Sequence, residues 1–239
     1  MRFDIMTLFT SLVETVLSES IIGRARASGL IEIHTHDIRD FSENKHRRVD
    51  DTPYGGGMGM LMSPVPIYNC YRSILESMAD KPDCKRRVIY MSPKGSVLTQ
   101  DKARELLGYD NLVILCGHYE GVDQRIIDEI VDEEISIGDY VLTGGELPAC
   151  ILVDSVSRMI EGVLSDKECY ENESIASGLL EYPQYTRPYE FNGRKVPDVL
   201  LSGHHENIEK WRKEQALLLT KEKRPDLLSD NRKEQTDLG

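Results

Sequence analysis

The chain has 239 residues, of which 40% are hydrophobic and 29% charged, and its formal net charge is −12 at pH 7. No apolar run approaches the roughly 20 residues needed to span a bilayer, and the N-terminus has no signal-peptide pattern. We therefore expect a cytoplasmic protein without membrane contact. The five cysteines form no Cys-x-x-Cys pair, and His34 and His36 have no third ligand at a suitable spacing. These features indicate reduced cysteines and surface histidines and predict no metal site.

The negative charge is concentrated in the middle of the chain. Residues 1–109 carry 15 basic and 14 acidic side chains, residues 110–175 carry 3 and 16, and residues 176–239 carry 11 and 11. An acidic total argues against a nucleic-acid partner, although basic clusters in the outer thirds can meet phosphates. Charge alone therefore favours a protein that does not bind RNA.

The first third is predicted to contain two strands, two helices and one long loop. Residues 2–9 and 30–38 alternate in hydrophobicity like strands, and residues 12–27 between them fit a single helix. Residues 39–59 are polar and glycine-rich, and a loop of that length is typically functional or disordered. Residues 67–78 restore a helical pattern.

Three apolar runs in the middle of the chain each lead into a glycine-bearing turn and then a helical pattern. The runs lie at residues 87–91, 111–116 and 135–142, and the following helices reach residues 107, 131 and 160. One such turn is an ordinary strand-to-helix connection, but three in succession favour a ligand site at the carboxyl edge of a mostly parallel sheet. Neither Gly-x-Gly-x-x-Gly nor a Walker lysine loop occurs, so we expect neither a dinucleotide nor a triphosphate there.

The last third is predicted to be a small helical domain joined by a linker. The apolar periodicity lapses after residue 160, so we expect domains over residues 1–160 and 176–239, with a flexible linker over residues 161–175. A helix should follow Ser202 and Gly203, with an inward face made by Ile208, Trp211 and Leu218.

Several long segments carry a family resemblance. They are Tyr-Met-Ser-Pro-Lys-Gly at residues 90–95, Cys-Gly-His-Tyr-Glu-Gly at residues 116–121 and Ser-Ile-Gly-Asp-Tyr-Val-Leu-Thr-Gly-Gly-Glu-Leu-Pro at residues 136–148. Further landmarks lie at residues 53–62, 154–158 and 185–188. The chain, from its N-terminus to at least Trp211, resembles bacterial tRNA (guanine-37-N1)-methyltransferases. This resemblance implies an α/β fold of the SPOUT superfamily, with a mostly parallel sheet and a deep trefoil knot in the cofactor-binding domain, plus a small helical C-terminal domain that binds tRNA.

The resemblance also implies a function and its partners. The reaction is methylation of guanine N1 at position 37 of tRNA, next to the anticodon, with S-adenosylmethionine as cofactor. Active sites would be shared between the subunits of a homodimer, with residues 53–60 on the RNA side and assistance from Mg²⁺. The cofactor contacts carried over are Tyr90, Ser92, Gly117, Tyr119, Glu120, Gly121, Ser136, Ile137, Gly138, Tyr140, Leu142, Gly144 and Gly145.

Two catalytic residues follow from the resemblance. The family's general base is an Asp in Asp-Ser-Phe-x-x-Gly-Leu-Leu, and this chain has Glu173-Ser-Ile-Ala-Ser-Gly-Leu-Leu, so the aligned base is Glu173. Arg158 matches the arginine of Asp-Ser-Val-Ser-Arg. A carboxylate can take the N1 proton while a guanidinium stabilises the charge that develops on O6. Taken alone, Glu173 would be a solvated linker residue and Arg158 a helix-end residue that covers carbonyls.

The sequence departs from the family pattern at two positions, and two alternative functions remain open. His118 stands where the family frequently has Arg, and Gln184 where it often has His. One alternative is a methyltransferase of the same fold that modifies a ribose 2′-hydroxyl. The other is a non-catalytic RNA-binding protein with a relic cofactor pocket, which the change from Asp to Glu173 would favour.

Overall fold

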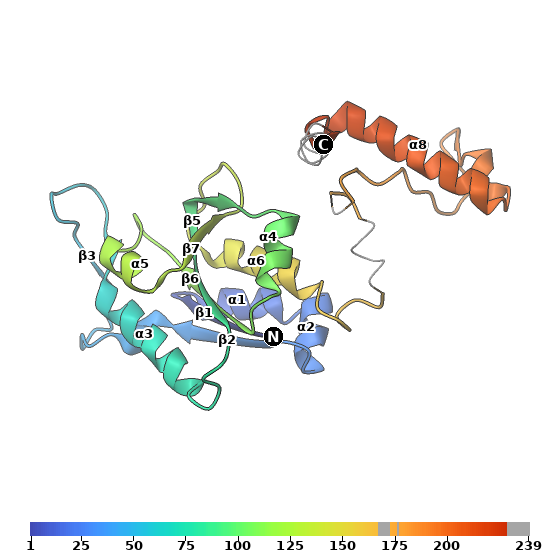
Figure 1. The fold of residues 1–239 in the computed structure, drawn as a ribbon. Helices are drawn as coiled ribbons and strands as arrows, with labels where there is room; N and C mark the ends of the chain where they lie inside the picture. The colour runs from blue at the N-terminus through green and yellow to red at the C-terminus, as the bar shows by residue number, and fades with distance from the viewer. Residues whose placement is uncertain (167–172, 176, 229–239) are drawn as a thin grey trace, which may run out of the picture. The chain divides into compact units, whose positions relative to one another are not determined.

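A computed structural model of the chain describes residues 1–166, 173–175 and 177–228 (Figure 1). It divides into two compact units, Met1–Ser165 and Asp166–Gly239. Residues 161–165, which we assigned to the linker, belong to the first unit, where Glu161 and Leu164 form an isolated bridge. Part of the expected linker, including Cys169, lies outside the described residues.

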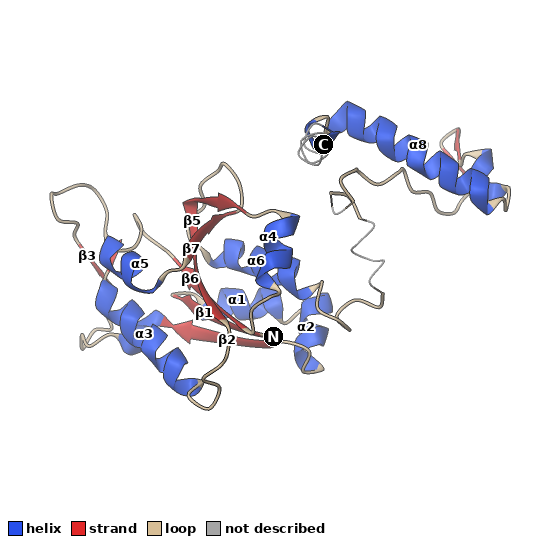
Figure 2. Cartoon of the chain, viewed as in Figure 1, coloured by secondary structure: helices blue, strands red, loops and turns tan. Residues whose placement is uncertain are grey.

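A five-stranded sheet forms the centre of the first unit (Figure 2). Its order is β2-β1-β6-β5-β7, and all four neighbouring pairs are parallel. The strands are β1 (Arg2–Thr7), β2 (Glu32–Asp37), β5 (Arg86–Val97), β6 (Asn111–Cys116) and β7 (Glu133–Ser136). In the register, Leu115 lies opposite both Met6 and Tyr90, so the carboxyl ends of the three central strands meet at one edge.

Helices cover both faces of this sheet. On one face α3 and α5 pack together, and on the other α6 packs against α1 and α4. All six residues of β6 are buried, as expected for a strand covered on both faces. The helices are α1 (Thr10–Leu17), α2 (Ser20–Ala27), α3 (Pro64–Ser77), α4 (Gln100–Leu106), α5 (Gln124–Ile130) and α6 (Glu146–Ser157).

The single helix expected over residues 12–27 is wrong, because the chain breaks it into α1 and α2. Ser20 has a φ of 54°, outside the helical region. A Cβ built on Gly23 would collide with the Ser18 carbonyl, so the sharp bend requires glycine there. The hydrophobic residues keep a helical periodicity through the bend, so the sequence pattern did not indicate a break.

The turn expected after residue 91 is also different, because β5 extends to Val97. Its pairing with β7 shifts register between Met91 and Ser96, which marks a bulge. A Cβ on Gly95 would collide with the Glu134 carbonyl, so the glycine permits close contact with β7. The long loop before α3 contains a 3-10 helix (Ile38–Phe41) and the small hairpin of β3 (Asp50–Asp51) and β4 (Leu61–Met62).

Asp4 is a buried ionised group at the centre of the sheet. Its carboxylate accepts hydrogen bonds from Arg2 Nε at 2.7 Å and Asn111 Nδ2 at 2.8 Å, and lies 2.8 Å from His36 Nε2. Burial raises the pKa of Asp4, but hydrogen bonds from His36 and Arg2 outweigh it and lower the pKa to about 2. His36, which we expected at the surface, is partly buried, with 19% of its side chain exposed.

The described residues of the second unit form a short hairpin, a 3-10 helix and one long helix. They are β8 (Glu190–Phe191), β9 (Arg194–Lys195), η2 (Asp198–Leu201) and α8 (His205–Lys223). Trp211 lies beside Tyr182 and Tyr185, with ring centroids 6.4 Å apart in each pair.

The expected inward position of Leu218 on α8 is wrong, because this side chain is 57% exposed. The buried residues of the helix are Ala216 and Thr220, and the Thr220 hydroxyl accepts a hydrogen bond from Leu180 N at 2.9 Å. Leu218 is two residues from Ala216 and so lies about 200° around the helix from it. The helix therefore buries a narrower face than its sequence indicated.

Candidate functional site

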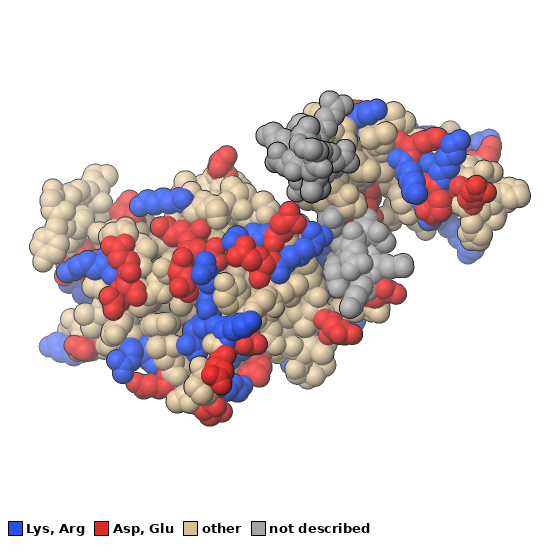
Figure 3. Space-filling model, in the orientation of Figure 1, with Lys and Arg blue, Asp and Glu red and all other residues tan. Residues whose placement is uncertain are grey.

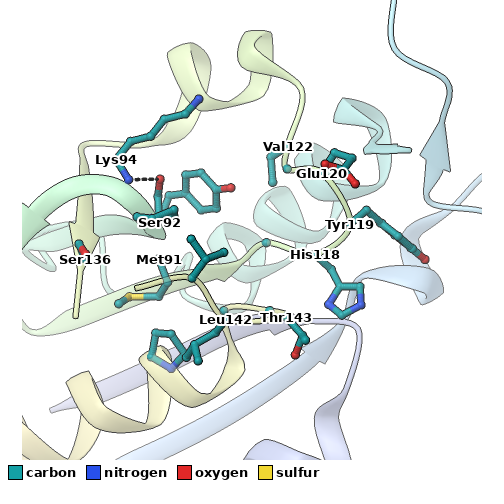
Figure 4. Close-up of a pocket in the computed structure, with 18 of the residues that line it drawn as sticks. Met91, Ser92, Lys94, His118, Tyr119, Glu120, Val122, Ser136, Leu142 and Thr143 are labelled. Carbon is teal, nitrogen blue, oxygen red and sulfur yellow. Dashed lines mark hydrogen bonds between the residues drawn. The ribbon is translucent and has the colours of Figure 1, made fainter. Parts of the chain in front are cut away.

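One pocket of the first unit lies beside residues 90–94 of β5, at the carboxyl ends of β6 and β7 and at the start of α6 (Figure 4). Its volume is about 350 Å³, within the range of small-molecule sites. Most of its lining comes from three stretches of the chain: residues 90–94, residues 117–122, and residues 135–137 with 140–145. This is the edge at which open parallel sheets bind ligands.

Twelve of the thirteen residues expected to contact a cofactor line this one pocket. The exception is Gly138, which is not among the lining residues. It has a φ of 140°, and a Cβ there would meet the Tyr140 ring at 2.8 Å. Gly138 also exchanges hydrogen bonds with the Ser136 hydroxyl, at 3.0 and 3.2 Å. Gly138 therefore shapes the turn that holds Ser136 and Tyr140 in the pocket wall.

Backbone contacts join the pocket segments. Gly145 N donates to Gly117 O at 2.9 Å, and a Cβ on Gly145 would lie 2.8 Å from Cys116 Cα. A Cβ on Gly117 would lie 2.8 Å from the Tyr90 ring. The glycines are therefore required by close packing between segments as well as by any ligand.

Two polar side chains in the pocket wall are buried, and one wall residue has an uncommon backbone conformation. Tyr90 is buried, and burial raises the pKa of its hydroxyl to about 12, so it remains a neutral donor. Ser92 is also buried, and its hydroxyl accepts from Lys94 N at 3.2 Å (Figure 4). Tyr119 has a φ of 59°, an uncommon conformation for a residue other than glycine.

The glycine-rich segment, residues 53–62, is attached to the pocket wall. Glu120 N donates to Met60 O at 3.0 Å, and Met62 N donates to Gly121 O at 2.9 Å. A Cβ on Gly59 would collide with the Glu120 side chain. The far end of this segment is open to solvent, since Tyr54 is 98% exposed.

The structure adds residues to the pocket that sequence reasoning did not assign to it. Lys94, His118, Thr143 and Pro148 belong to the recognised segments and Leu61 to the landmark at residues 53–62, so proximity to the assigned residues was the available signal. Val122 and Ile135 directly adjoin two of those segments. Ile127, from α5, lies outside them, and no local pattern identified it as a pocket residue.

The two expected catalytic residues belong to different units. Arg158 is the C-cap of α6, and its backbone N donates to Asp154 O at 3.1 Å. It is not among the residues that line the pocket of the first unit. Glu173 is half-buried in the second unit. Their catalytic roles therefore stay predictions.

Some acidic side chains in the middle of the chain are used in internal contacts. Glu133 pairs with Arg87 at 2.9 Å and with Lys102 at 3.2 Å, and Asp132 accepts a hydrogen bond from Val88 N at 2.7 Å. Figure 3 shows acidic and basic side chains interleaved on the visible face of the first unit. Charges of both signs therefore lie side by side on this face, although such pairing leaves the formal net charge of −12 unchanged.

No metal cluster or membrane span is present in the part of the chain that the structure describes. Its His, Cys, Asp and Glu side chains form no group of three or more that could hold a metal ion. None of its described helices is both long and apolar enough to cross a bilayer.

Comparison with known proteins identifies relatives along the whole chain. The family model described as tRNA (Guanine-1)-methyltransferase TrmD matches residues 1–230. Similar proteins, each named tRNA (guanine-N(1)-)-methyltransferase, occur in several bacteria. One from Ruminiclostridium cellulolyticum is 59% identical over 96% of this chain and 97% of its own length. One from Lachnospira eligens is 53% identical over 99% of both chains. One from Clostridioides difficile is 54% identical over 95% of this chain and 97% of its own length.

The match accounts for both the fold and the pocket. The expected α/β architecture with a parallel sheet and a helical C-terminal region is confirmed. The three segments that carried the resemblance are those that the structure brings together around the pocket. The chain therefore belongs to the tRNA (guanine-1)-methyltransferase family, whose members are enzymes with the trefoil-knotted SPOUT fold.

Proposed function

We propose that this enzyme transfers a methyl group from S-adenosylmethionine to N1 of guanine 37 in tRNA, with Glu173 as general base and Arg158 as the stabiliser of the O6 charge. The strongest support is the convergence of twelve family-derived positions on one pocket, in a chain that matches the family over residues 1–230. Every curated relative described above is named as a guanine-N1 methyltransferase acting on tRNA, which disfavours ribose methylation.

The pocket suits S-adenosylmethionine in size and chemistry. Its volume of about 350 Å³ accommodates a nucleoside with a short side chain, and its wall combines backbone amides with apolar surface. Leu142, Ile137 and Pro148 offer apolar contact for an adenine ring, and the glycine backbones at 117, 144 and 145 offer close approach. When bound there, the cofactor supplies a methyl group on a sulfonium, whose carbon–sulfur bond breaks as the N1–carbon bond forms.

Glu173 would remove the proton that blocks N1. The N1–H bond breaks, the carboxylate takes the proton, and the electron pair left on N1 forms the new bond. Such general base catalysis contributes about 10²–10⁴ in rate. Glu173 has one more methylene than the family's Asp but similar basicity, so its backbone must be placed differently for the carboxylate to reach N1.

Arg158 would stabilise the negative charge that spreads from N1 to O6 as the proton leaves. A guanidinium is always charged and presents planar donors to such an oxygen. Its C-cap position supports this role, because the last turn of α6 anchors its backbone on Asp154. A rigid backbone limits the reorganisation that its charge would otherwise require during the reaction.

An exposed apolar patch supports a homodimer. The patch consists of apolar side chains at the start of the first unit and on α6, which packs against α1: Phe9, Leu12, Val16, Leu147 and Ile151. A contiguous patch of this kind indicates a protein contact, and a second copy is the occupant we propose. In the dimer, Glu173 of one subunit would serve the pocket of the other. Sedimentation should show a dimer that Val16→Lys converts to monomer, with Val97→Lys as an exposed control outside the patch.

The second unit has a surface suited to RNA. Residues 184–195 are all exposed, and they combine three aromatic side chains with three cations. Phe191, 68% exposed, lies on the hairpin beside Arg194 and Lys195. Aromatic rings stack on unpaired bases and cations meet phosphates, which is the pattern of single-strand recognition. An anticodon loop supplies unpaired bases of this kind.

Two further expectations form part of the proposal. Mg²⁺ assistance rests on the resemblance alone, since the described side chains form no cluster of three metal-binding groups, and no step above passes through a metal. Loss of methyl transfer on chelation, restored by Mg²⁺, would support it. A cytoplasmic location agrees with the free thiols of the four described cysteines, Cys70, Cys84, Cys116 and Cys150.

A methyl-transfer assay tests the proposed function directly. Labelled cofactor is supplied with an unmodified tRNA that carries guanines at positions 36 and 37, and the tRNA is then digested to nucleosides. We expect N1-methylguanosine from this tRNA and none from a matched tRNA with adenine at position 37. Methylated ribose would show the alternative reaction, and cofactor binding without transfer would indicate a non-catalytic RNA-binding protein.

A further inference from the structure

His118 lies in the pocket wall with part of its ring unused. The imidazole packs between the rings of Phe9 and Tyr119, with centroid distances of 5.0 and 5.1 Å. Its Nδ1 atom is buried and has no hydrogen-bond partner among the described residues. Buried polar atoms are nearly always satisfied, so an unpartnered nitrogen here calls for a specific explanation.

The candidate partner for this nitrogen is the carboxylate of Glu146, the first residue of α6. Its side chain is buried, and Oε1 accepts a hydrogen bond from Thr7 Oγ1 at 2.8 Å. Thr7 ends β1, and its hydroxyl in turn accepts from Phe9 N at 2.9 Å. The carboxylate therefore connects β1 with the N-terminus of α6, where negative charge is favourable.

Gly144 brings these two groups together. A Cβ built on Gly144 would lie within 2.8 Å of both His118 Nδ1 and Glu146 Oε2. The Cβ would be 2.4 Å from Glu146 Oε2 and 2.8 Å from His118 Nδ1, so the two atoms are no more than 5.2 Å apart, and both face a glycine that lines the pocket. Figure 4 shows His118 beside Thr143, the residue that precedes this glycine.

We propose that His118 is a positioning residue, which donates a hydrogen bond from Nδ1 to Glu146 Oε2 when the segment at Gly144 and Gly145 closes on a bound ligand. The bond completes a buried chain from Thr7 through Glu146 to His118 and holds the closed segment in place. This inference rests on the proposed function in taking S-adenosylmethionine as the ligand.

Calorimetric titration with S-adenosylmethionine tests the inference. His118→Phe keeps an aromatic ring beside Phe9 but removes the donor, so we expect about tenfold weaker binding, equivalent to about 1.4 kcal/mol. His118→Asn places an amide donor near the Nδ1 position, so affinity should be partly restored. Wild-type affinity in His118→Phe, or no recovery in His118→Asn relative to His118→Phe, would overturn the inference.

A second measurement detects the hydrogen bond itself. In nitrogen NMR of the imidazoles with S-adenosylmethionine bound, Nδ1 of His118 should carry a proton, and the His118 signal is assigned by its absence in His118→Asn. A proton on Nε2 alone would overturn the inference. If the wild type fails to bind S-adenosylmethionine, the proposed function fails instead. Glu146→Gln is informative only if it folds, so the two His118 variants carry the test.

Discussion

The pocket of the first unit and the surface of the second unit that we propose for RNA are built on opposite principles. The pocket is defined by backbone: Gly117 and Gly145 are in contact, and a single added methyl group at either position would collide with a neighbouring segment. The second unit presents exposed side chains on a hairpin and one long helix that buries only a narrow face. A buried sheet edge fixes atoms closely enough for chemistry, whereas exposed rings and cations suit a large and adaptable partner.

The largest effect is expected at Glu173. The proposed mechanism gives this residue of the second unit a catalytic role, which is the main exception to the contrast between the two units. Glu173→Gln should lower turnover by about 10²–10⁴ while leaving cofactor affinity unchanged, since it removes the base alone. Single-turnover methylation and cofactor titration measure the two effects. Glu173→Asp, which restores the family residue, is the matched control and should remain active. Near-normal turnover in Glu173→Gln would remove this residue from the mechanism.

The rigidity of the first unit should depend on Asp4. Asp4→Asn should cost about 3 kcal/mol in the free energy of unfolding, because it leaves Arg2 without its buried counterion. The pKa of Asp4 is lowered to about 2, below its ordinary value of 3.8, so folding favours the ionised form. The stabilisation is then fully present above about pH 4 and is lost as pH falls through about 2.

Urea unfolding of wild type and Asp4→Asn at several acidic pH values tests this dependence. The wild type should lose about 2 kcal/mol more than the variant as the carboxylate becomes protonated. An equal loss in both proteins would show that other carboxyl groups dominate acid unfolding.

The close packing of the pocket can be tested at Gly145. A methyl group there would lie 2.8 Å from Cys116 Cα, so Gly145→Ala must displace one segment. A shift of about 1 Å should weaken cofactor binding or turnover by about 10²-fold. Gly108→Ala is the control, since its methyl group would meet only the Glu105 carbonyl at 3.2 Å. Equal effects of the two substitutions would contradict a pocket defined by backbone contact.

The smallest effect is expected on α8. Leu218→Ala should change the free energy of unfolding by no more than about 0.5 kcal/mol, because the side chain is exposed. Trp211→Ala should cost more, because this ring packs against two tyrosines. Thermal unfolding of both variants compares them, and a larger cost at Leu218 would indicate a buried contact that the isolated unit does not have.

Local patterns predicted the elements of the first unit well. Residues 111–116 form a strand with the expected bounds, and the expected runs near residues 2–9, 30–38 and 87–91 correspond to β1, β2 and β5. The failures lie where one glycine changes the path without interrupting the periodicity, as at Gly23 and Gly95. Such glycines are required by a neighbouring backbone, and the sequence around them carries no sign of that neighbour.

The sequence by itself determined the class of elements, the three glycine-bearing segments of the pocket and, through their resemblance, the family. Only the tertiary structure decided the strand order β2-β1-β6-β5-β7 and the convergence of those segments. It alone placed Glu146 beside His118 and joined Glu146 to Thr7, 139 positions away. Periodicity reports which face of an element is buried, but the partners on that face come from distant parts of the chain and depend on how the whole core packs.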